Sequence, residues 1–539
     1  MPATLADPEP APSGKTAAAG QSRSDGRRAW LPWLVRLVGA VASGFVLFLS
    51  FAPRPLWWLA PLAFAGFGLV LHGRRFWGGF GYGTAFGAGL FVPLLTWIQD
   101  FVGPGFGPVP WLALSLVLAA YLGLVGGLGS FVQLLPCAPC WLALVAIAAE
   151  TPRAWFPFGG FPWGRVAFSQ PEGAYLSLAS IGGAPLVGFA VALSGFGLAR
   201  VILRLRAREW RPVVVPALAT LLPLVAGLAV WPTIGTEAQD GTRTVAAVQG
   251  SAPDTGLGLF VNGADLRSTH IAESERLIAD IKAGKVPRPD LVVWPETATA
   301  VDGPDPRLDR LVADFGVPAL IGASYELPGR RYENALVVWD PRTGQGRRYT
   351  KQQLVPFGEY VPARALTELV SPFTRSIDER TPGTGDPAAL DVAGTKVGAM
   401  ICYEVAYDYT GREAVDAGAE LLTSPTNNAW YGHSDMTYQH LAMSRLRAVE
   451  HGRAVVVAAT TGVSEIIQPD GTVSGSTGMF TPASLVRSVP LRTTVTVADR
   501  LGAWPEYVLA AAAVAGVLAG ITRRRRSRRA EETRTGAAG

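Results

Sequence analysis

Long apolar runs alternate with short arginine-bearing stretches over the first 230 or so residues, and one further apolar run lies near the C-terminus. A membrane-spanning helix needs about 20 predominantly apolar residues. Most of these runs approach that length, and the run that ends at Glu150 is the shortest. The pattern predicts a polytopic helical membrane protein with about eight spans. The runs cover residues 30–51, 55–72, 78–98, 109–134, 139–150, 176–199, 212–231 and 503–521.

The N-terminal residues 1–28 are rich in Ala, Pro, Gly and Ser, a composition that predicts a disordered tail. The first apolar run follows Arg27 and Arg28, which gives it some likeness to a secretory signal peptide. It has no clear cleavage motif of small residues, and further apolar runs follow at once. We therefore predict a retained helix, with transmembrane helices 1–7 at residues 29–232 and helix 8 at residues 501–522.

Between the seventh and eighth runs, residues 233–500 have a different pattern, in which short strand-like runs alternate with helix-like segments. Residues 268–285 place apolar side chains at helical spacing, and Asp470-Gly471 is a hairpin signal. This predicts an α/β domain of roughly 260 residues, which is long enough for a core of its own. The strand candidates are residues 244–249, 290–294, 319–323, 335–339, 396–401, 420–424 and 454–459.

The charged residues indicate an orientation for the chain. Only 17% of the residues are charged, the net charge is +5, and the arginines cluster between the apolar runs. All clusters fall on one side of a membrane if seven spans precede the α/β domain and one follows it. This predicts cytoplasmic termini, a basic cytoplasmic tail at 523–539 and an extracytoplasmic α/β domain in a cell membrane. Because topology explains the clusters, we expect no nucleic-acid partner. The clusters are Arg23, Arg27 and Arg28; Arg74 and Arg75; Arg200, Arg204, Arg206, Arg208 and Arg211; and Arg523–Arg526 with Arg528 and Arg529.

The chain has three cysteines. Cys137 and Cys140 lie between two apolar runs, where a disulfide or half a metal site is an alternative to two small apolar residues at a helix end. Cys402 stands alone, where a strand-like run ends and a helix is predicted to begin. Such a turn would expose the thiol near helix N-terminal N–H groups, which favour a thiolate.

A thiol with a pKa of about 8.5 still needs a base at neutral pH. The five histidines carry no protease signature around them and are better explained as structural or solvent-facing groups. Glu296, which follows the strand-like run 291–294, is the better candidate for the base, and Lys351 is a candidate for stabilising negative charge. Taken singly, Glu296 could be a helix-start residue and Lys351 a surface group. Taken together, Glu296, Lys351 and Cys402 each end a strand-like run, which favours a catalytic set.

The order Glu, Lys, Cys, together with the residues around each of the three, resembles the nitrilase (carbon–nitrogen hydrolase) superfamily. The longer motifs around these residues resemble the apolipoprotein N-acyltransferase branch of that superfamily. In the membrane part, Gly160-Phe-Pro-Trp-Gly164 and Phe168-Ser-Gln170 also match. The resemblance covers about residues 30–522. The other motifs that carry it are Trp294-Pro-Glu-Thr297, Lys351 to Pro362 (with Pro356-Phe-Gly-Glu-Tyr-Val-Pro362 as the strongest part), Ile401-Cys-Tyr-Glu404, Thr426 to Gly432 and Gln439 to Glu450.

The resemblance implies an αββα sandwich for the α/β domain, and an enzyme without a cofactor or a metal. It implies transfer of an acyl chain from a membrane phospholipid, through a Cys thioester, to the α-amino group of the S-diacylglyceryl cysteine of an apolipoprotein. By position, Glu296 would be the general base, Lys351 the oxyanion stabiliser and Cys402 the nucleophile. The supporting positions are Glu359 and Glu404, which would orient Lys351 and the substrate amine, together with Tyr403 and Trp430.

Two other readings compete with the acyltransferase. The first is a membrane-tethered amidase of the nitrilase type, which the three residues alone do not separate from an acyltransferase. The membrane motifs Phe161-Pro-Trp163 and Phe168-Ser-Gln170 favour the acyltransferase. The second is a transporter or an inactive scaffold, and the intact Glu, Lys, Cys set argues against it.

Overall fold

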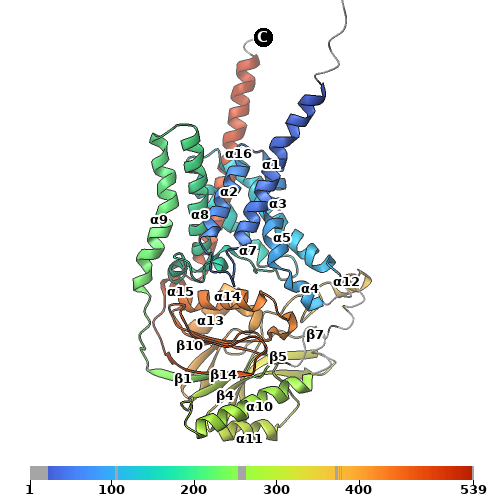
Figure 1. The fold of residues 1–539 in the computed structure, drawn as a ribbon, viewed down its shortest axis with the longest axis vertical. Coiled ribbons are helices and arrows are strands. Elements are labelled where there is room, and N and C mark those ends of the chain that lie inside the picture. Colours follow the sequence, from blue (N-terminus) through green and yellow to red (C-terminus); the bar gives the residue numbers. More distant parts are fainter. Residues whose placement is uncertain are drawn as a thin grey trace, which may run out of the picture.

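The computed structural model describes residues 22–102, 107–252, 263–329, 331–370, 374, 377 and 379–536. It separates in space into a bundle of helices and a β-sandwich, and the C-terminal helix runs from the sandwich back along the bundle (Figure 1). The bundle contains α1 (Ser22–Phe48), α2 (Leu59–Leu71), α3 (Phe76–Leu94), α4 (Trp97–Val102), α5 (Val109–Val132), α6 (Ala138–Ala148), α7 (Glu150–Arg153), α8 (Ala179–Arg206), α9 (Val214–Val230) and α16 (Trp504–Gly536).

Each of the eight predicted apolar runs contains a helix of this bundle. Helices that are long and apolar enough to cross a membrane lie at Val109–Val132, Leu176–Arg206, Arg211–Thr233 and Trp504–Ala530. Helix α2 has 13 residues and α6 has 11. At about 1.5 Å per residue they are shorter than a bilayer core of about 30 Å. The membrane character is confirmed, and the number of spans stays a prediction.

The two chain ends contain more helix than their composition predicted. Residues 1–21 of the predicted N-terminal tail lie outside the described residues, but α1 already begins at Ser22. Helix α16 likewise continues through the arginine-rich segment to Gly536. Extending an existing helix requires no new nucleus, so an apolar helix can carry its polar flanks with it.

Small residues bring α3 and α5 into close contact. A Cβ atom on Gly79 would lie 2.2 Å from the carbonyl oxygen of Gly126, and one on Gly83 would lie 2.2 Å from the carbonyl oxygen of Leu122. Glycine at these positions lets the two backbones touch, as is common between helices in membranes.

The sandwich consists of two sheets with helices outside them. The first sheet has the order β14-β1-β2-β4-β5-β6, with β3 beside β4 and β7 beside β5, and the second has the order β13-β12-β11-β10-β9-β8. Its strands are β1 (Thr242–Gln249), β2 (Leu291–Val293), β3 (Thr299–Val301), β4 (Ala319–Leu327), β5 (Arg331–Asp340), β6 (Gly344–Thr350), β7 (Glu379–Arg380), β8 (Ala389–Val392), β9 (Thr395–Ala399), β10 (Leu421–Thr426), β11 (Val455–Ala459), β12 (Glu465–Ile467), β13 (Val473–Ser476) and β14 (Ala483–Pro490). Its helices are α10 (Gly263–Lys282), α11 (Pro306–Phe315), α12 (Arg364–Val370), α13 (Asp408–Asp416), α14 (Met436–His451) and α15 (Val497–Leu501).

Three apolar cores define the layers. One core lies between the sheets and joins residues such as Val293 and Val456. A second packs α10 and α11 on the outer face of the first sheet. A third continues from the second sheet through α14 into the helical bundle. These layers are the αββα sandwich that the sequence resemblance implied.

The strands that the apolar pattern predicted are all present, and the hairpin predicted at Asp470-Gly471 joins β12 to β13. Strands β3, β6, β7, β8 and β14 were missed. Strand β6 is largely exposed and polar, and Arg487 and Ser488 interrupt the apolar pattern of β14.

Buried polar contacts fix the sandwich to the bundle. Asp408, in the first turn of α13, binds Arg165 of the bundle at 2.8 Å and Arg447 of α14 at 2.7 Å. The indole of Trp163 donates to Gln439 of α14 at 2.6 Å. Because unpairing a buried charge costs several kcal/mol, about 3–5 in measured cases, these contacts fix the orientation of the two parts. The motif around Trp163 therefore has a docking role.

Candidate active site

Cys402 lies just beyond β9, at the first residue of the short 3-10 helix Cys402–Ala406. Its φ is +51°, a left-handed conformation that is uncommon for a residue with a side chain. The imidazole of His440 lies 2.9 Å from the carbonyl oxygen of Cys402, which helps to hold this turn. Burial lowers the pKa of His440 to about 4, so the ring is neutral. The predicted sharp turn is confirmed.

Glu296 follows β2 after Trp294 and Pro295, and its carboxylate is held on both oxygens. Oε1 accepts from the side-chain amide of Asn334 at 2.6 Å and from the ammonium of Lys351 at 2.8 Å. Oε2 accepts from the backbone N–H of Asn427 at 2.9 Å. Three donors thus fix one carboxylate in a buried position.

Lys351 is the first residue after β6 and is buried between two carboxylates. Its Nζ lies 2.8 Å from Oε1 of Glu296 and 2.9 Å from Oε2 of Glu359. Asn334 also donates to Oε1 of Glu359, at 3.2 Å. Lys351 and Asn334 therefore connect the two acids.

The buried charges determine which groups are ionised. Burial alone would raise the pKa of Glu296, but the charge and hydrogen bond of Lys351, with the donors on Asn427 and Asn334, lower it below its usual value. Burial alone would lower the pKa of Lys351, but Glu296 and Glu359 raise it well above its usual value. At neutral pH the site therefore holds a carboxylate beside an ammonium.

The thiol differs from the sequence prediction in its exposure. Cys402 is only 5% exposed. Burial, and then the negative charge of Glu296, raise the pKa of Cys402 above its usual value, although Lys351 opposes the shift. The expectation that the turn would expose the thiol was wrong, and the buried turn removes the water that would solvate a thiolate. At neutral pH the Cys402 side chain is therefore a neutral thiol.

Glu296, Lys351 and Cys402 line one cavity of about 240 Å³. Most of its walls come from the sandwich, and Phe101 of α4 is supplied by the helical bundle. A thiol, a carboxylate and an ammonium in one cavity can carry out nucleophilic attack on a carbonyl, proton transfer and oxyanion stabilisation. The other lining residues are Thr297, Ser324, Tyr332, Asn334, Val355, Phe357, Gly358, Glu359, Ile377, Arg380, Asn427, Trp430 and Tyr431.

The four supporting residues predicted from the sequence fall into two groups. Glu359 and Trp430 line the cavity, and Glu359 also accepts from the N–H of Val355 at 2.9 Å. Tyr403 and Glu404 do not line it. The Tyr403 hydroxyl donates to the carbonyl oxygen of Gly160 in the bundle at 3.2 Å.

The carboxylate of Glu404 joins the Lys351 loop to the Cys402 turn. It accepts from the N–H groups of Gln352 at 2.7 Å, Gln353 at 3.1 Å and Ile401 at 2.7 Å, and from the hydroxyl of Tyr349 at 3.0 Å. Glu404 is fully buried by these contacts. It can position Lys351 through the backbone, but it does not reach a substrate amine in the cavity.

Sequence reasoning missed Asn334 and the backbone donor of Asn427. Asn334 is buried, but it follows Arg331 and Glu333 at the polar start of β5, so no break in an apolar pattern marked it in the sequence. The N–H of Asn427 had no signal either, because a backbone donor carries no residue-type information. Phe101 reaches the cavity only through tertiary packing.

Comparison with known proteins agrees with this division of the chain. Residues 43–197 match the model of the apolipoprotein N-acyltransferase N-terminal domain, and residues 245–499 match that of the carbon–nitrogen hydrolase family. The apolipoprotein N-acyltransferase of Mycolicibacterium smegmatis is 38% identical over 512 residues, covering 90% of this chain and 85% of its own. That of Azotobacter vinelandii is 32% identical over 499 residues, covering 86% of this chain and 91% of its own. Among solved structures, an amidase from Nesterenkonia sp. aligns with 48% of this chain and 93% of its own at 18% identity, with a TM-score of 0.34.

Proposed function

Since the chain belongs to the apolipoprotein N-acyltransferase family, we propose that it moves an acyl chain from a membrane phospholipid to the α-amino group of an S-diacylglyceryl cysteine at the N-terminus of an apolipoprotein. The reaction passes through a thioester on Cys402. The two half-reactions use the same base and the same ammonium.

In the first half-reaction Glu296 takes the proton of the Cys402 thiol as the sulfur attacks the ester carbonyl of the phospholipid. The oxyanion that forms is stabilised by the ammonium of Lys351. When the tetrahedral intermediate collapses, the ester C–O bond breaks and the leaving alkoxide takes the proton from Glu296. The products are the Cys402 thioester and a lysophospholipid.

In the second half-reaction a neutral amine attacks the thioester carbonyl, and Glu296 accepts the proton that the amine loses. Lys351 stabilises the second oxyanion. Collapse breaks the C–S bond, and the sulfur recovers the proton from Glu296. The amide is the product, and the resting thiol is restored.

The observation that favours an acyltransferase over a hydrolase of small amides is the set of apolar side chains that line the cavity. Phe101, Phe357 and Trp430 line the cavity, and Phe101 comes from the helical bundle. The ring of Phe158, in the bundle, lies 5.8 Å from that of Phe357, and the neighbouring Phe156 is 69% exposed. Exposed aromatic residues at the edge of a helical bundle are typical of the membrane interface. Such a rim suits an acyl chain and is unnecessary for a small soluble amide.

The proposal is tested with a phospholipid labelled in its acyl chain, a diacylglyceryl peptide with a free N-terminal amine, and a small aliphatic amide. We expect label on the peptide amine and no ammonia from the amide. Ammonia release at a rate comparable with acyl transfer would support the amidase instead. Acetylating the peptide amine is the matched control and should remove the transfer.

We also propose that both termini are cytoplasmic and that the sandwich is extracytoplasmic, because the arginine clusters then all lie on one side. A cysteine introduced at Asp302, an exposed residue of the sandwich, should react in intact cells with a maleimide that does not cross membranes. A cysteine at Ser527, an exposed residue of α16, should react only after the membrane is opened. The reverse labelling pattern would invalidate this topology.

A further inference from the structure

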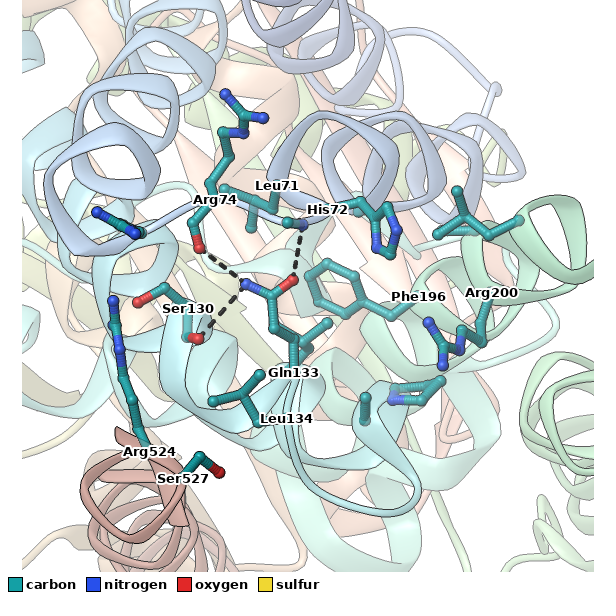
Figure 2. A pocket seen from close by; sticks show the side chains of 18 of the residues that line it. Leu71, His72, Arg74, Ser130, Gln133, Leu134, Phe196, Arg200, Arg524 and Ser527 are labelled. Atoms are coloured by element: carbon teal, nitrogen blue, oxygen red, sulfur yellow. Dashed lines mark hydrogen bonds between the residues drawn. The ribbon is translucent and has the colours of Figure 1, made fainter. Parts of the chain in front are cut away.

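A second cavity, of about 480 Å³, lies in the helical bundle and contains none of the three reacting residues. Its walls come from the turn between α2 and α3 and from α5, α6, α8 and α16 (Figure 2). The turn and the basic segment of α16 lie at the end of the bundle that faces away from the sandwich (Figure 1). This cavity is therefore separate from the proposed acyl-transfer site.

The cavity is strongly basic. Five of its lining residues are arginines, and none of its lining residues is acidic. Within the described part of the chain, none of these five guanidinium groups forms an ion pair with a carboxylate. Like charges gathered without counter-charges repel one another, so the cavity favours a bound anion. The arginines are Arg74, Arg75, Arg200, Arg524 and Arg528.

One glutamine holds the wall of the cavity in place, and two buried polar atoms of the wall have no hydrogen-bond partner among the described residues. Gln133 accepts from the N–H of Gly73 at 3.1 Å and donates to the carbonyl oxygen of Arg74 at 3.1 Å, which fixes the turn against α5 (Figure 2). Ser130 is 4% exposed, and its hydroxyl has no hydrogen-bond partner among the described residues. Nε of Arg74 is also buried without such a partner. Buried polar atoms are rarely left unpaired, so these two are suited to a ligand.

Apart from His72 and Ser527, the remaining lining of the cavity is apolar, and this feature favours some anions over others. Leu71, Leu142, Phe196 and Leu203 contribute to the walls beside the arginines. A free phosphate ion would gain nothing from these side chains. A phospholipid presents a phosphate that guanidinium groups bind with paired hydrogen bonds, and acyl chains that apolar walls accept.

We propose that this cavity binds the phosphate headgroup of one anionic phospholipid from the leaflet in which the arginine-rich helix ends lie. Arginines near an anionic leaflet gain about 1 kcal/mol each without any site. Binding in a specific cavity differs from this general attraction, because the affinity for the lipid then depends on which arginines are present and not on how many.

The test compares two variants with equal loss of charge. Arg200→Gln/Arg524→Gln removes two cavity arginines, and Arg206→Gln/Arg525→Gln removes two exposed arginines from the same helices, α8 and α16. The full chain is purified in detergent with a diether phosphatidylglycerol, which cannot acylate Cys402, and bound lipid is counted by native mass spectrometry. We expect the cavity variant to lose about tenfold in affinity for one lipid, as for the loss of about 1.4 kcal/mol, and the surface variant to match the wild type.

Two further measurements separate the alternatives. Ser130→Leu fills the cavity without changing the charge and should also lose the lipid. Equal lipid loss in the two double variants, retention in Ser130→Leu, or displacement of the lipid by an equal concentration of inorganic phosphate would each overturn the proposal. Acyl-adduct formation on Cys402 should persist in all three variants, so this result is independent of the proposed acyl-transfer chemistry.

Discussion

Replacing Cys402 with alanine is expected to abolish acyl transfer, and replacing it with serine to leave little more than the alanine level. Removing the nucleophile from a set of catalytic residues that act together costs about 10⁶-fold in the best-measured enzymes. Serine keeps the shape of the side chain, but a hydroxyl ionises far less readily than a thiol, and the site already holds the thiol in its neutral form. The measurement is intact-mass spectrometry of the chain mixed with phospholipid and no acceptor.

Wild-type chain should gain one acyl group in that experiment, and neutral hydroxylamine should remove it, as for a thioester. Adding a diacylglyceryl peptide with a free amine should also discharge it. The matched control is Cys137→Ser/Cys140→Ser, which removes the two other cysteines, neither of which lines the catalytic cavity. An adduct that persists in the presence of the peptide, or that forms only after the peptide is added, would contradict the two-step order.

The order of events follows from the sharing of one cavity as well as from its chemistry. Glu296, Lys351 and Cys402 line a single cavity, so both lipid substrates have to reach the same three groups. A covalent intermediate lets the lysophospholipid leave before the lipoprotein enters. Glu296 is left without its proton at the end of the first half-reaction, because the alkoxide has taken it, and is ready to act as base for the amine.

The apolar pattern predicted an α/β domain because the buried strands read as apolar runs of five or six residues, such as residues 335–339 in β5 and 454–459 in β11, whereas the αββα sandwich was implied by the family resemblance. Glu296 and Cys402 follow such runs, whereas Lys351 follows the exposed, polar strand β6. Their strands β2, β6 and β9 are not neighbours, and β9 belongs to the second sheet, so the packing of the two sheets brings the three residues to one cavity. Exposed strands such as β6 left no comparable pattern.

The ionisation of the site could not be predicted in this way. Whether Cys402 is a thiol or a thiolate depends on its burial and on Glu296 and Lys351, which are more than 50 residues away along the chain. The basic cavity in the helical bundle could not be predicted from the sequence either. Arg74, Arg200 and Arg524 were each assigned to topology, and only the packing of three distant segments places them around one cavity (Figure 2).

Replacing Glu296 with glutamine is expected to slow formation of the acyl adduct by roughly 10²-fold or more, the usual scale for loss of a general base. Glutamine keeps the size of the side chain but cannot satisfy all three donors that Glu296 binds. It does best by keeping its oxygen toward Lys351 and Asn334 and turning its amide toward the N–H of Asn427. That arrangement leaves the Asn427 N–H without an acceptor and buries the amide N–H groups of the glutamine beside it, and each unpaired donor costs about 1–3 kcal/mol in stability.

The pH dependence of adduct formation distinguishes a base from a residue that only holds Lys351. In the wild type the pKa of Glu296 is lowered, so the carboxylate is already ionised at pH 6 and the rate should be flat from about pH 6 to 8. In Glu296→Gln the negative charge of Glu296 no longer acts on the thiol, but burial still raises the pKa of Cys402. The residual reaction then depends on the rare thiolate, so the rate should climb about tenfold per pH unit. Glu359→Gln is the matched control, because Glu359 binds the same ammonium at 2.9 Å and is not the proposed base. It should slow the reaction through Lys351 and keep the flat profile, whereas a flat profile in Glu296→Gln, or a rising one in Glu359→Gln, would assign the base to another residue.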